Sequence, residues 1–437
     1  MVQVEVVRAE TVKPSSPTPD HLRRLELSFL DQVSPPVFMP IVLFFPDDGV
    51  HSDQEKGDRI KESLSEALTL YYPLAGRVKD NLYVDCNDEG VLYVEARVRC
   101  QLYDILRDPV PKVLNEFLPV ELDDVKELPV AVQVNFFDCG GLAISLCMSH
   151  KVADALSFFN FLNAWAATSR RDSSEPLPSP CFTSSSLFPP VDLTGLRLST
   201  GISKEGASTK RYVFDAATIA ALRERYTDYN SQARRPTRVE ALSSFLWTRF
   251  MAATGKSVGD PDTMYTILHA VNLRPRIDPP LSERNFGNIS RFALTFPSKE
   301  AAEEGGPMLV DEVREAIKKI NPEYVRTLHD PERHGHLRLM KERSSGLMKG
   351  QVVSTSFTSL CRFPLYEADF GWGRPVWAGS ASLKFNNLIV FLDTRTGDGI
   401  EAWVNLKEEE MEKFNADKEL LAHASAKVGV GIKGGPL

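Results

Sequence analysis

The sequence predicts a two-lobed α/β (α+β) protein with mixed sheets. Three observations support this prediction. The chain has 437 residues, which suits two domains of about two hundred residues each. Segments with strand periodicity alternate with segments of helical periodicity. Residues 170–206 are rich in Ser, Pro, Thr and Gly with little periodicity, which is typical of a crossover between lobes. We therefore expect lobes at 1–175 and 207–437, joined by a linker at 176–206.

The elements of the N-terminal lobe follow from the spacing of its apolar residues. Between Asp53 and Tyr72 they recur at helical spacing and predict an amphipathic helix. Residues 92–98 and 130–136 alternate between apolar and other side chains, which predicts two half-buried strands. The turn residues 138–141 then lead into an apolar run at 142–148, which predicts a returning, fully buried strand.

A further helix and the C-terminal lobe complete the predicted order. Apolar residues keep helical spacing from Ala153 to Thr168, so the preceding His150 is expected at a junction between strand and helix. Such junctions often carry functional side chains. For the second lobe we expect strands near 211–214, 265–271 and 388–393, and helices near 216–226, 237–254 and 407–426.

Composition excludes several classes of function. The net charge is −8 and the sequence pI is about 5.6, without a basic stripe, so nucleic-acid binding is not expected. The chain shows neither a targeting signal nor an apolar run long enough to cross a membrane. Its six cysteines are scattered without a CxxC pair, which is typical of reduced thiols in the cytoplasm. We expect a cytoplasmic monomer.

Other motifs lack the context that their chemistry needs. The GxGxxG match at 429–434 has only three residues behind it, so no helix can follow to hold a pyrophosphate. His329, His334 and His336 lie among charged residues, and a solvated polar loop explains them better than a metal site. We expect no metal. The key residues of common hydrolases and kinases are also absent.

The candidate chemistry lies in the segment 149–154. Asp154 follows His150 by four residues, which would place both side chains on one helical face if the helix already included His150. A second motif, Asp369-Phe370-Gly371-Trp372-Gly373, lies far downstream. Alone, the His150–Asp154 spacing is weak evidence of a catalytic site. It becomes stronger evidence because the second motif follows it in the chain.

With these two motifs the chain resembles the BAHD family of plant acyltransferases, which carry HxxxD and DFGWG in this order. The segments 72–77 and 272–276 and the pair Gly287-Asn288 are similar to further signatures of the family. Within it, residues 15–19, 84–98 and 137–141 resemble the vinorine synthase-like alkaloid acetyltransferases. This resemblance implies a chloramphenicol acetyltransferase-like fold with an active-site channel between its lobes. It also implies an acyl-CoA cosubstrate, with a preference for acetyl-CoA, and no tightly bound cofactor.

The implied reaction gives His150 a defined role. An alcohol is a poor nucleophile at neutral pH, and an imidazole with a pKa near ~6.5 is suited to remove its proton. The departing CoA thiolate then takes this proton, so direct transfer in a ternary complex is expected. The resemblance further implies that Asp154 pairs with Arg274 as a structural contact. Asp369 is a catalytic or site-supporting candidate, and the glycines of its motif suit a tight loop.

The sequence departs from the family pattern at two positions. Ala155 replaces a Gly, and Leu360 replaces a Trp that is thought to steady the oxyanion in relatives. Thr358, Ser359 or a backbone N–H are candidate replacements for this donor. Asn272 is a further candidate for contact with the oxyanion or with CoA.

The expected function is therefore transfer of an acetyl group to a hydroxyl of a specialised metabolite, an alkaloid or a terpenoid. Three alternatives remain open at this stage. The first is an enzyme that forms volatile or longer-chain esters, and the second is one that acylates an amine. The third is a catalytically silent binding protein of the same fold.

Overall fold

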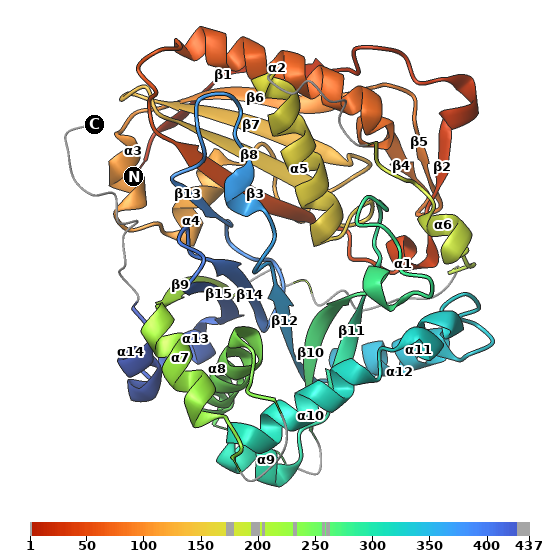
Figure 1. Cartoon of the computed structure of the whole chain (residues 1–437), viewed down its shortest axis with the longest axis vertical. Helices are drawn as coiled ribbons and strands as arrows, with labels where there is room; N and C mark the ends of the chain where they lie inside the picture. The colour runs from red at the N-terminus through yellow and green to blue at the C-terminus, as the bar shows by residue number, and fades with distance from the viewer. Residues whose placement is uncertain are drawn as a thin grey trace.

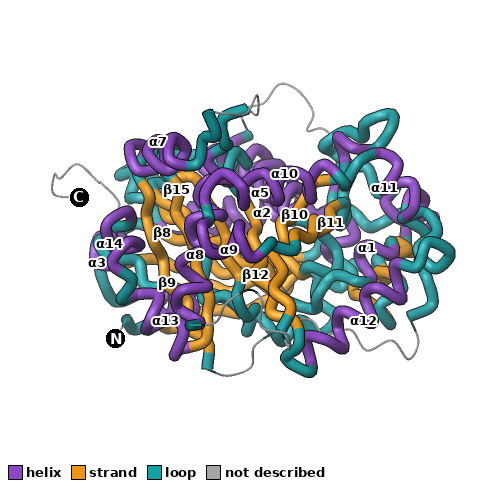
Figure 2. The backbone as a smooth tube through the Cα atoms, turned by 90° about the horizontal axis from the view of Figure 1, so that it is seen from below, coloured by secondary structure: helices purple, strands orange, loops and turns teal. Residues whose placement is uncertain are grey.

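The computed structural model describes residues 2–171, 179–193, 202, 206–229, 234–255, 258 and 263–425. Two six-stranded sheets organise these residues, together with a small three-stranded sheet. Figure 1 shows the first large sheet in the upper half of the molecule and the second in the lower half. Figure 2 shows helices α8 (Arg238–Thr254) and α10 (Gly306–Lys318) beside strands β12 (Val352–Ser359) and β10 (Met264–Asn272) of the second sheet. The predicted mixed α/β architecture with two lobes is confirmed.

The first sheet has both parallel and antiparallel neighbours. Strands β6 and β7 run parallel, and the other pairs are antiparallel. The hairpin between β7 and β8 closes as predicted, with Gly140 at φ +78°. In sheet order, the strands are β1 (Val4–Val12), β6 (Val91–Val98), β7 (Val130–Phe137), β8 (Leu142–Ser149), β3 (Phe38–Phe45) and β13 (Trp377–Gly379).

Strand β7 differs from its prediction. Its alternating pattern predicted one exposed face, but all eight residues are buried. The polar side chains on the second face meet the backbone of a covering segment. Gln133 Nε2 donates to the carbonyl of Glu116 at 3.3 Å, and Asn135 Nδ2 donates to that of Phe117 at 3.1 Å. The alternation therefore reflects two buried environments, one apolar and one hydrogen-bonded.

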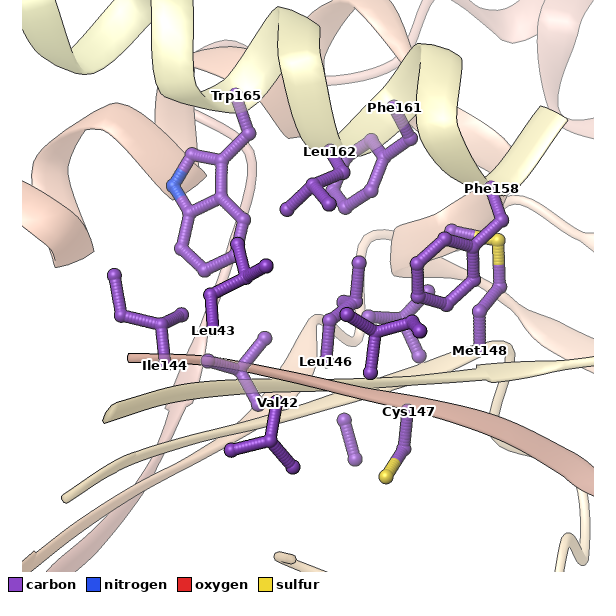
Figure 3. Close-up of a cluster of buried hydrophobic side chains, with 14 of the residues drawn as sticks. Val42, Leu43, Ile144, Leu146, Cys147, Met148, Phe158, Phe161, Leu162 and Trp165 are labelled. Carbon is purple, nitrogen blue, oxygen red and sulfur yellow. The ribbon is translucent and has the colours of Figure 1, made fainter. Parts of the chain in front are cut away.

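Two helices cover one face of the first sheet and pack against each other. They are α2 (Asp53–Leu70) and α5 (Ala155–Arg170). The indole N–H of Trp165 in α5 joins them by donating to the carbonyl of Ile60 at 3.2 Å. Figure 3 shows side chains of α5 directed at strands β3 and β8, among them Phe158, Phe161, Leu162 and Trp165. This apolar contact fixes where α5 begins relative to the end of β8.

The second sheet is mixed and carries its own core. Strands β10, β12 and β14 run parallel, and the remaining pairs are antiparallel. Its strands, in sheet order, are β11 (Ser290–Thr295), β10 (Met264–Asn272), β12 (Val352–Ser359), β14 (Leu388–Asp393), β15 (Ile400–Lys407) and β9 (Ala207–Phe214). The longer helices of this lobe are α7 (Ala216–Arg225), α8 (Arg238–Thr254), α10 (Gly306–Lys318) and α12 (His336–Met348).

The second half of the chain also contributes to the first lobe. Strand β13 pairs with β3, although it lies at residues 377–379. Trp403 of β15 belongs to the same hydrophobic core as the first sheet, and its ring stacks on that of Trp377 at 6.3 Å between centroids. A single cut at the expected linker, 176–206, therefore does not separate the two cores. Residues 176–178, 194–201 and 203–205 of that linker lie outside the described residues.

The remaining elements are short. The predicted closing helix at 407–426 is two helices, because the carboxylate of Asp417 accepts the N–H of Leu420 at 2.7 Å and caps a new start. No helix in the described part of the chain is long and apolar enough to cross a membrane. The short strands are β2 (Arg24–Glu26), β4 (Arg77–Lys79) and β5 (Tyr83–Asp85); the short helices are α1 (Phe29–Gln32), α3 (Leu102–Leu106), α4 (Pro111–Leu114), α6 (Ser184–Leu187), α9 (Lys299–Glu304), α11 (Pro322–Thr327), α13 (Glu408–Asn415) and α14 (Lys418–His423).

Candidate active site

His150 stands directly behind the buried strand β8. Strand β8 ends at Ser149 and helix α5 begins at Ala155, so the predicted junction is present. The backbone N–H of His150 donates to the carbonyl of Val37 at 2.8 Å, which ties the junction to the neighbouring β3 segment. The residue as a whole is only partly buried. His150 is therefore anchored through its backbone while its ring can still meet a substrate.

The imidazole of His150 is held by the side chain of Asn288. Its Nδ1 lies 2.9 Å from Asn288 Oδ1, and Asn288 Nδ2 donates to the backbone carbonyl of His150 at 2.8 Å. Because Nδ2 faces a carbonyl, the amide oxygen must face the ring. An oxygen acceptor requires a proton on Nδ1, so Nε2 carries the free lone pair. This arrangement prepares Nε2 to act as a base.

Burial tunes two neighbouring titratable groups. Removal from water lowers the pKa of His150 below its ordinary value, although the nearby charge of Asp154 and the hydrogen bond to Asn288 act in the opposite direction. Burial also lowers the pKa of Lys151 to about 8, and its Nζ donates to the carbonyl of Gln32 at 2.8 Å. A neutral imidazole at physiological pH is the form that can accept a proton.

Asp154 belongs to a different part of the site from His150. It is the N-cap of α5, and its Oδ1 accepts the N–H of Ser157 at 3.0 Å. The helix therefore starts after both motif residues, so the condition under which His150 and Asp154 would share a helical face is not met. The Asp154 carboxylate instead pairs with Arg274, with Oδ2 2.7 Å from Nη1 and Oδ1 3.2 Å from Nη2. This is the contact that the family resemblance implied.

Arg274 is enclosed by oxygen acceptors. Only 1% of it is exposed. Its Nε and Nη2 donate to the carbonyl of Asn285 at 2.9 and 2.7 Å. Asn272 Oδ1 accepts from its Nη1 and its backbone N–H. Asn272 thus supports Arg274 through its Oδ1, and its assignment as a candidate for the oxyanion or CoA stays a prediction.

The segment 287–289 joins these contacts. Its three successive backbone N–H groups donate to Ser157 Oγ at 3.1 Å, to Asp31 Oδ1 at 2.8 Å and to Asp154 Oδ2 at 3.0 Å. Gly287 has φ +126°, and a Cβ there would lie 2.8 Å from Ser184 Oγ, so only glycine fits. The sequence showed Gly287-Asn288 as a family signature without a role. Asp31 gave no functional signal beyond its place in a capping pattern, Ser-x-x-Asp.

Asp369 lies near the end of α5 that is remote from His150, and its role as a catalytic or site-supporting residue stays a prediction. Its backbone carbonyl accepts from Arg170 at 3.0 Å, at the last residue of α5. His150 precedes the first residue of this 16-residue helix, and at a rise of about 1.5 Å per residue the two ends are roughly 24 Å apart. The Asp369 carboxylate instead accepts the N–H groups of Gly371 at 2.8 Å and Gly373 at 3.0 Å.

The rest of this motif anchors the second half of the chain to the first lobe. Phe370 and Trp372 are buried and stack on each other at 6.0 Å. The ring of Phe370 meets Trp165 of α5 edge-on at 5.0 Å. Gly371 and Gly373 both have positive φ, +110° and +99°, which suits a tight loop. The DFGWG segment thus has a packing role.

Strand β12 carries the two hydroxyl candidates for the oxyanion, Thr358 and Ser359. Phe357 points into the core of the second lobe, so Thr358 points to the opposite face of the sheet. Leu360 packs against the core of the first lobe. Ser359 Oγ accepts the backbone N–H of Cys361 at 3.3 Å. Of the two hydroxyl candidates, Thr358 is the one on the face shared with Leu360.

The histidine cluster is more ordered than the predicted solvated loop. His336 is buried, and its Nε2 lies 2.7 Å from Thr327 Oγ1, while its ring meets Tyr324 edge-on. Within the ranges that the structure describes, no three His, Cys, Asp or Glu side chains are placed to hold a metal ion.

Comparison with known proteins identifies the family. The sequence model of the transferase family matches residues 2–421. The chain belongs to this family, the BAHD acyltransferases. It is therefore an acyltransferase that uses an acyl-CoA donor.

Similar proteins come from several plants. A limonoid 21-O-acetyltransferase of Citrus sinensis is 38% identical, with 97% of this chain and 99% of the relative covered. Epi-neemfruitin B synthase of Melia azedarach is 36% identical, with 98% and 100% covered. Stemmadenine O-acetyltransferase of Catharanthus roseus is 34% identical, with 95% and 97% covered.

Two solved structures support the fold. The crystal structure of vinorine synthase is 34% identical and superposes with a TM-score of 0.82, covering 97% of this chain and 99% of that one. F. graminearum TRI101, solved with coenzyme A and T-2 mycotoxin, is 16% identical with a TM-score of 0.71, covering 92% and 99%. The second likeness concerns the fold alone. The acyltransferase fold expected from the sequence is confirmed.

Proposed function

We propose that this BAHD enzyme transfers an acetyl group from acetyl-CoA to a hydroxyl group of a polycyclic plant metabolite, a limonoid-type terpenoid or an alkaloid. The observation that carries the proposal is the geometry of His150, whose Nδ1 is held 2.9 Å from Asn288 Oδ1. This contact leaves the lone pair of Nε2 free to accept a proton. The names of the similar acetyltransferases support the acetyl donor and these two classes of acceptor.

In the proposed mechanism, Nε2 of His150 removes the proton of the acceptor hydroxyl as its oxygen attacks the thioester carbonyl. A new C–O bond forms, and the carbonyl oxygen becomes an oxyanion. The hydroxyl of Thr358 is the side-chain donor that we assign to this oxyanion. The C–S bond then breaks, and the CoA thiolate takes the proton from His150. Donor and acceptor must be bound together for this direct transfer.

Strand β11 supports an apolar acceptor. It begins at Ser290, two residues after Asn288, the partner of the His150 ring. Phe292, Leu294 and Phe296 are 43%, 37% and 58% exposed, whereas Ala293 and Thr295 between them are buried. Phe292 and Leu294 therefore lie on one face of the strand, and Phe296 follows its last residue, Thr295. A surface of this kind suits a polycyclic hydrocarbon skeleton better than a small polar alcohol.

We also propose that the protein works as a monomer in the cytosol. All six cysteines are free thiols, which supports a reducing compartment. The oligomeric state is open to direct measurement by sedimentation or light scattering of the purified protein.

The test is an acceptor screen with recombinant protein. Limonoid and alkaloid alcohols are incubated with acetyl-CoA, and mass spectrometry detects the acetylated product while free CoA thiol is titrated. Butyryl-CoA, benzoyl-CoA and amine analogues of the best acceptor test for a longer-chain or N-acyl transferase. The matched control is His150→Gln, which keeps a polar side chain but no base.

Two outcomes would overturn the proposal. Absence of CoA release with every acceptor would favour a silent binding protein. Parallel initial-rate patterns, together with an acylated enzyme isolated after incubation with acetyl-CoA alone, would indicate a covalent intermediate. Intersecting patterns are expected.

A further inference from the structure

Asp31 is a buried carboxylate with four hydrogen-bond donors. Only 3% of it is exposed. Its Oδ2 accepts the backbone N–H of Ser28 at 2.9 Å and the Ser28 hydroxyl at 2.6 Å. Its Oδ1 accepts the backbone N–H of Asn288 at 2.8 Å and the side-chain Nδ2 of Asn288 at 2.9 Å. The two oxygens therefore serve two different parts of the chain.

The contacts of Oδ2 have a local explanation. Ser28 is the N-cap of α1 and Asp31 is its third helical residue, so the two form a capping box. This motif accounts for a carboxylate at position 31. It does not account for Oδ1, because a capping box uses only the groups at the start of its own helix. Asn288 lies 257 residues further along the chain.

The contact of Oδ1 determines the orientation of the Asn288 amide. An ionised carboxylate can only accept hydrogen bonds, so the amide group that faces Asp31 must be Nδ2. The same Nδ2 also donates to the backbone carbonyl of His150. Oδ1 of Asn288 is then the only amide atom left for His150 Nδ1. With the amide reversed, its oxygen would face two other oxygens.

We propose that Asp31 is a positioning residue that, through the amide of Asn288, holds His150 in the tautomer with its proton on Nδ1 and its lone pair on Nε2. The inference rests on the proposed general-base role of His150. Asp31 does not touch the ring; it selects which end of Asn288 does. This is the logic of a base held in one tautomer by a second and third group, here with an amide between the carboxylate and the imidazole.

Charged groups around Asp31 are consistent with its ionised form. Lys151, next to His150, lies close enough for the Asp31 charge to act on it. Burial raises the pKa of Asp31 above its ordinary value, even with the hydrogen bonds from Ser28 and Asn288 acting in the opposite direction. A protonated Asp31 would have to use one of its oxygens as a donor. Each of the four groups around it is already a donor or can donate, so none of them requires a proton on Asp31.

The test compares Asp31→Asn with Ser28→Ala. An amide at position 31 brings an NH2 group to face either the Ser28 N–H or the Asn288 amide. The orientation of the Asn288 side chain is then held less firmly. We expect kcat to fall by about 10-fold or more with KM for acetyl-CoA and acceptor unchanged, since a general base contributes about 10²- to 10⁴-fold. Ser28→Ala removes a partner of Oδ2 only. It should lower the melting temperature and leave kcat unchanged.

Nitrogen-15 NMR of histidine-labelled protein reports the tautomer of His150 independently of enzymatic activity. The His150 signals, assigned by their loss in His150→Gln, should show a protonated Nδ1 and an unprotonated Nε2 in the wild type near neutral pH. In Asp31→Asn both tautomers should appear. In an Asn288→Ala background, Asp31→Asn should cause no further loss of kcat, because Asp31 acts through Asn288.

The outcomes are distinguishable from those of the function screen. A wild-type His150 with its proton on Nε2 would overturn the proposal even if Asp31→Asn does not fold. A folded Asp31→Asn variant with unchanged kcat and an unchanged tautomer would overturn it as well. The expected tautomer in a protein without acyltransferase activity would instead contradict the proposed function and leave the positioning intact.

Discussion

Asp154 and Arg274, 120 residues apart in the chain, form a buried pair in which Oδ2 and Nη1 are 2.7 Å apart. Asp154 also caps helix α5 and accepts the backbone N–H of Ile289. One carboxylate thereby joins the helix that follows His150 to the segment that carries Asn288. The aspartate of the HxxxD motif shapes the site without contacting the imidazole.

Replacing Asp154 should destabilise the protein more than it changes the chemistry. In Asp154→Ala the guanidinium of Arg274 stays buried without its counter-charge, which costs about 3–5 kcal/mol in the free energy of unfolding. Asp154→Asn keeps an acceptor for the helix cap and should lose less. Urea unfolding of the three proteins measures the difference. An Asp154→Ala variant as stable as the wild type would contradict this role.

Replacing His150 should change the chemistry more than the stability of the protein. His150→Gln removes the base, and kcat should fall by about 10²- to 10⁴-fold, with little change in the free energy of unfolding because the residue as a whole is only partly buried. Steady-state kinetics and the melting temperature of the same preparation check both statements. Turnover close to that of the wild type would remove His150 from the mechanism.

The two positive-φ glycines of the DFGWG loop offer a matched comparison. A Cβ on Gly371 would lie 2.5 Å from Nη2 of Arg59, whereas one on Gly373 would meet nothing within 4 Å. Arg59 has little room to yield, because its guanidinium donates to the carbonyls of Ser169 and Arg170. Gly371→Ala should therefore lower the free energy of unfolding by about 1–3 kcal/mol more than Gly373→Ala.

An additional variant separates this clash from backbone strain. In an Arg59→Ala background the extra cost of Gly371→Ala should largely disappear, since the obstructing side chain is gone. Denaturation curves of the single and double variants measure this coupling. Equal losses for both glycines in the wild-type background would show that φ alone decides the effect.

The sequence predicted those features that depend on neighbouring residues. The apolar run of β8 and the spacing within α5 placed His150 at a junction between strand and helix, as the structure has it. The pattern of β7 gave the strand but not its second buried face, because the segment that covers Gln133 and Asn135 packs there only in the folded chain. Local periodicity reports polarity, and tertiary packing decides exposure.

The partners of the imidazole could not be predicted in the same way. Asn288 is 138 residues from His150, and Asp31 is 257 residues from Asn288, so no local spacing connects them. The DFGWG motif indicated that Asp369 matters but not where it lies. Its contacts with Arg170 and the two glycines place it at the far end of α5.

The acidic limb of the pH–rate profile should lie below the ordinary histidine range. The reaction needs neutral His150, and the neutral fraction rises with pH through its pKa. Burial lowers that pKa from the reference value of 6.5, so the enzyme should keep activity at a lower pH than an exposed histidine would allow. A profile of kcat/KM against pH, measured with the best acceptor, reports the free enzyme and should show this single ionisation. A limb above pH 7 would mean that the charge of Asp154 outweighs burial.

The variant Asn288→Leu tests whether the hydrogen bond to Asn288 raises or lowers the pKa of His150. The hydrogen bond from Nδ1 to Asn288 favours the protonated ring and so raises the pKa of His150. Leucine is close to asparagine in size and keeps the ring away from water, but it accepts no hydrogen bond. The limb should therefore move to still lower pH, while the plateau of kcat falls because Nδ1 has lost the acceptor that fixes the tautomer. A shift to higher pH would indicate that water enters the site in the variant and that burial, not the amide, dominates the pKa of His150.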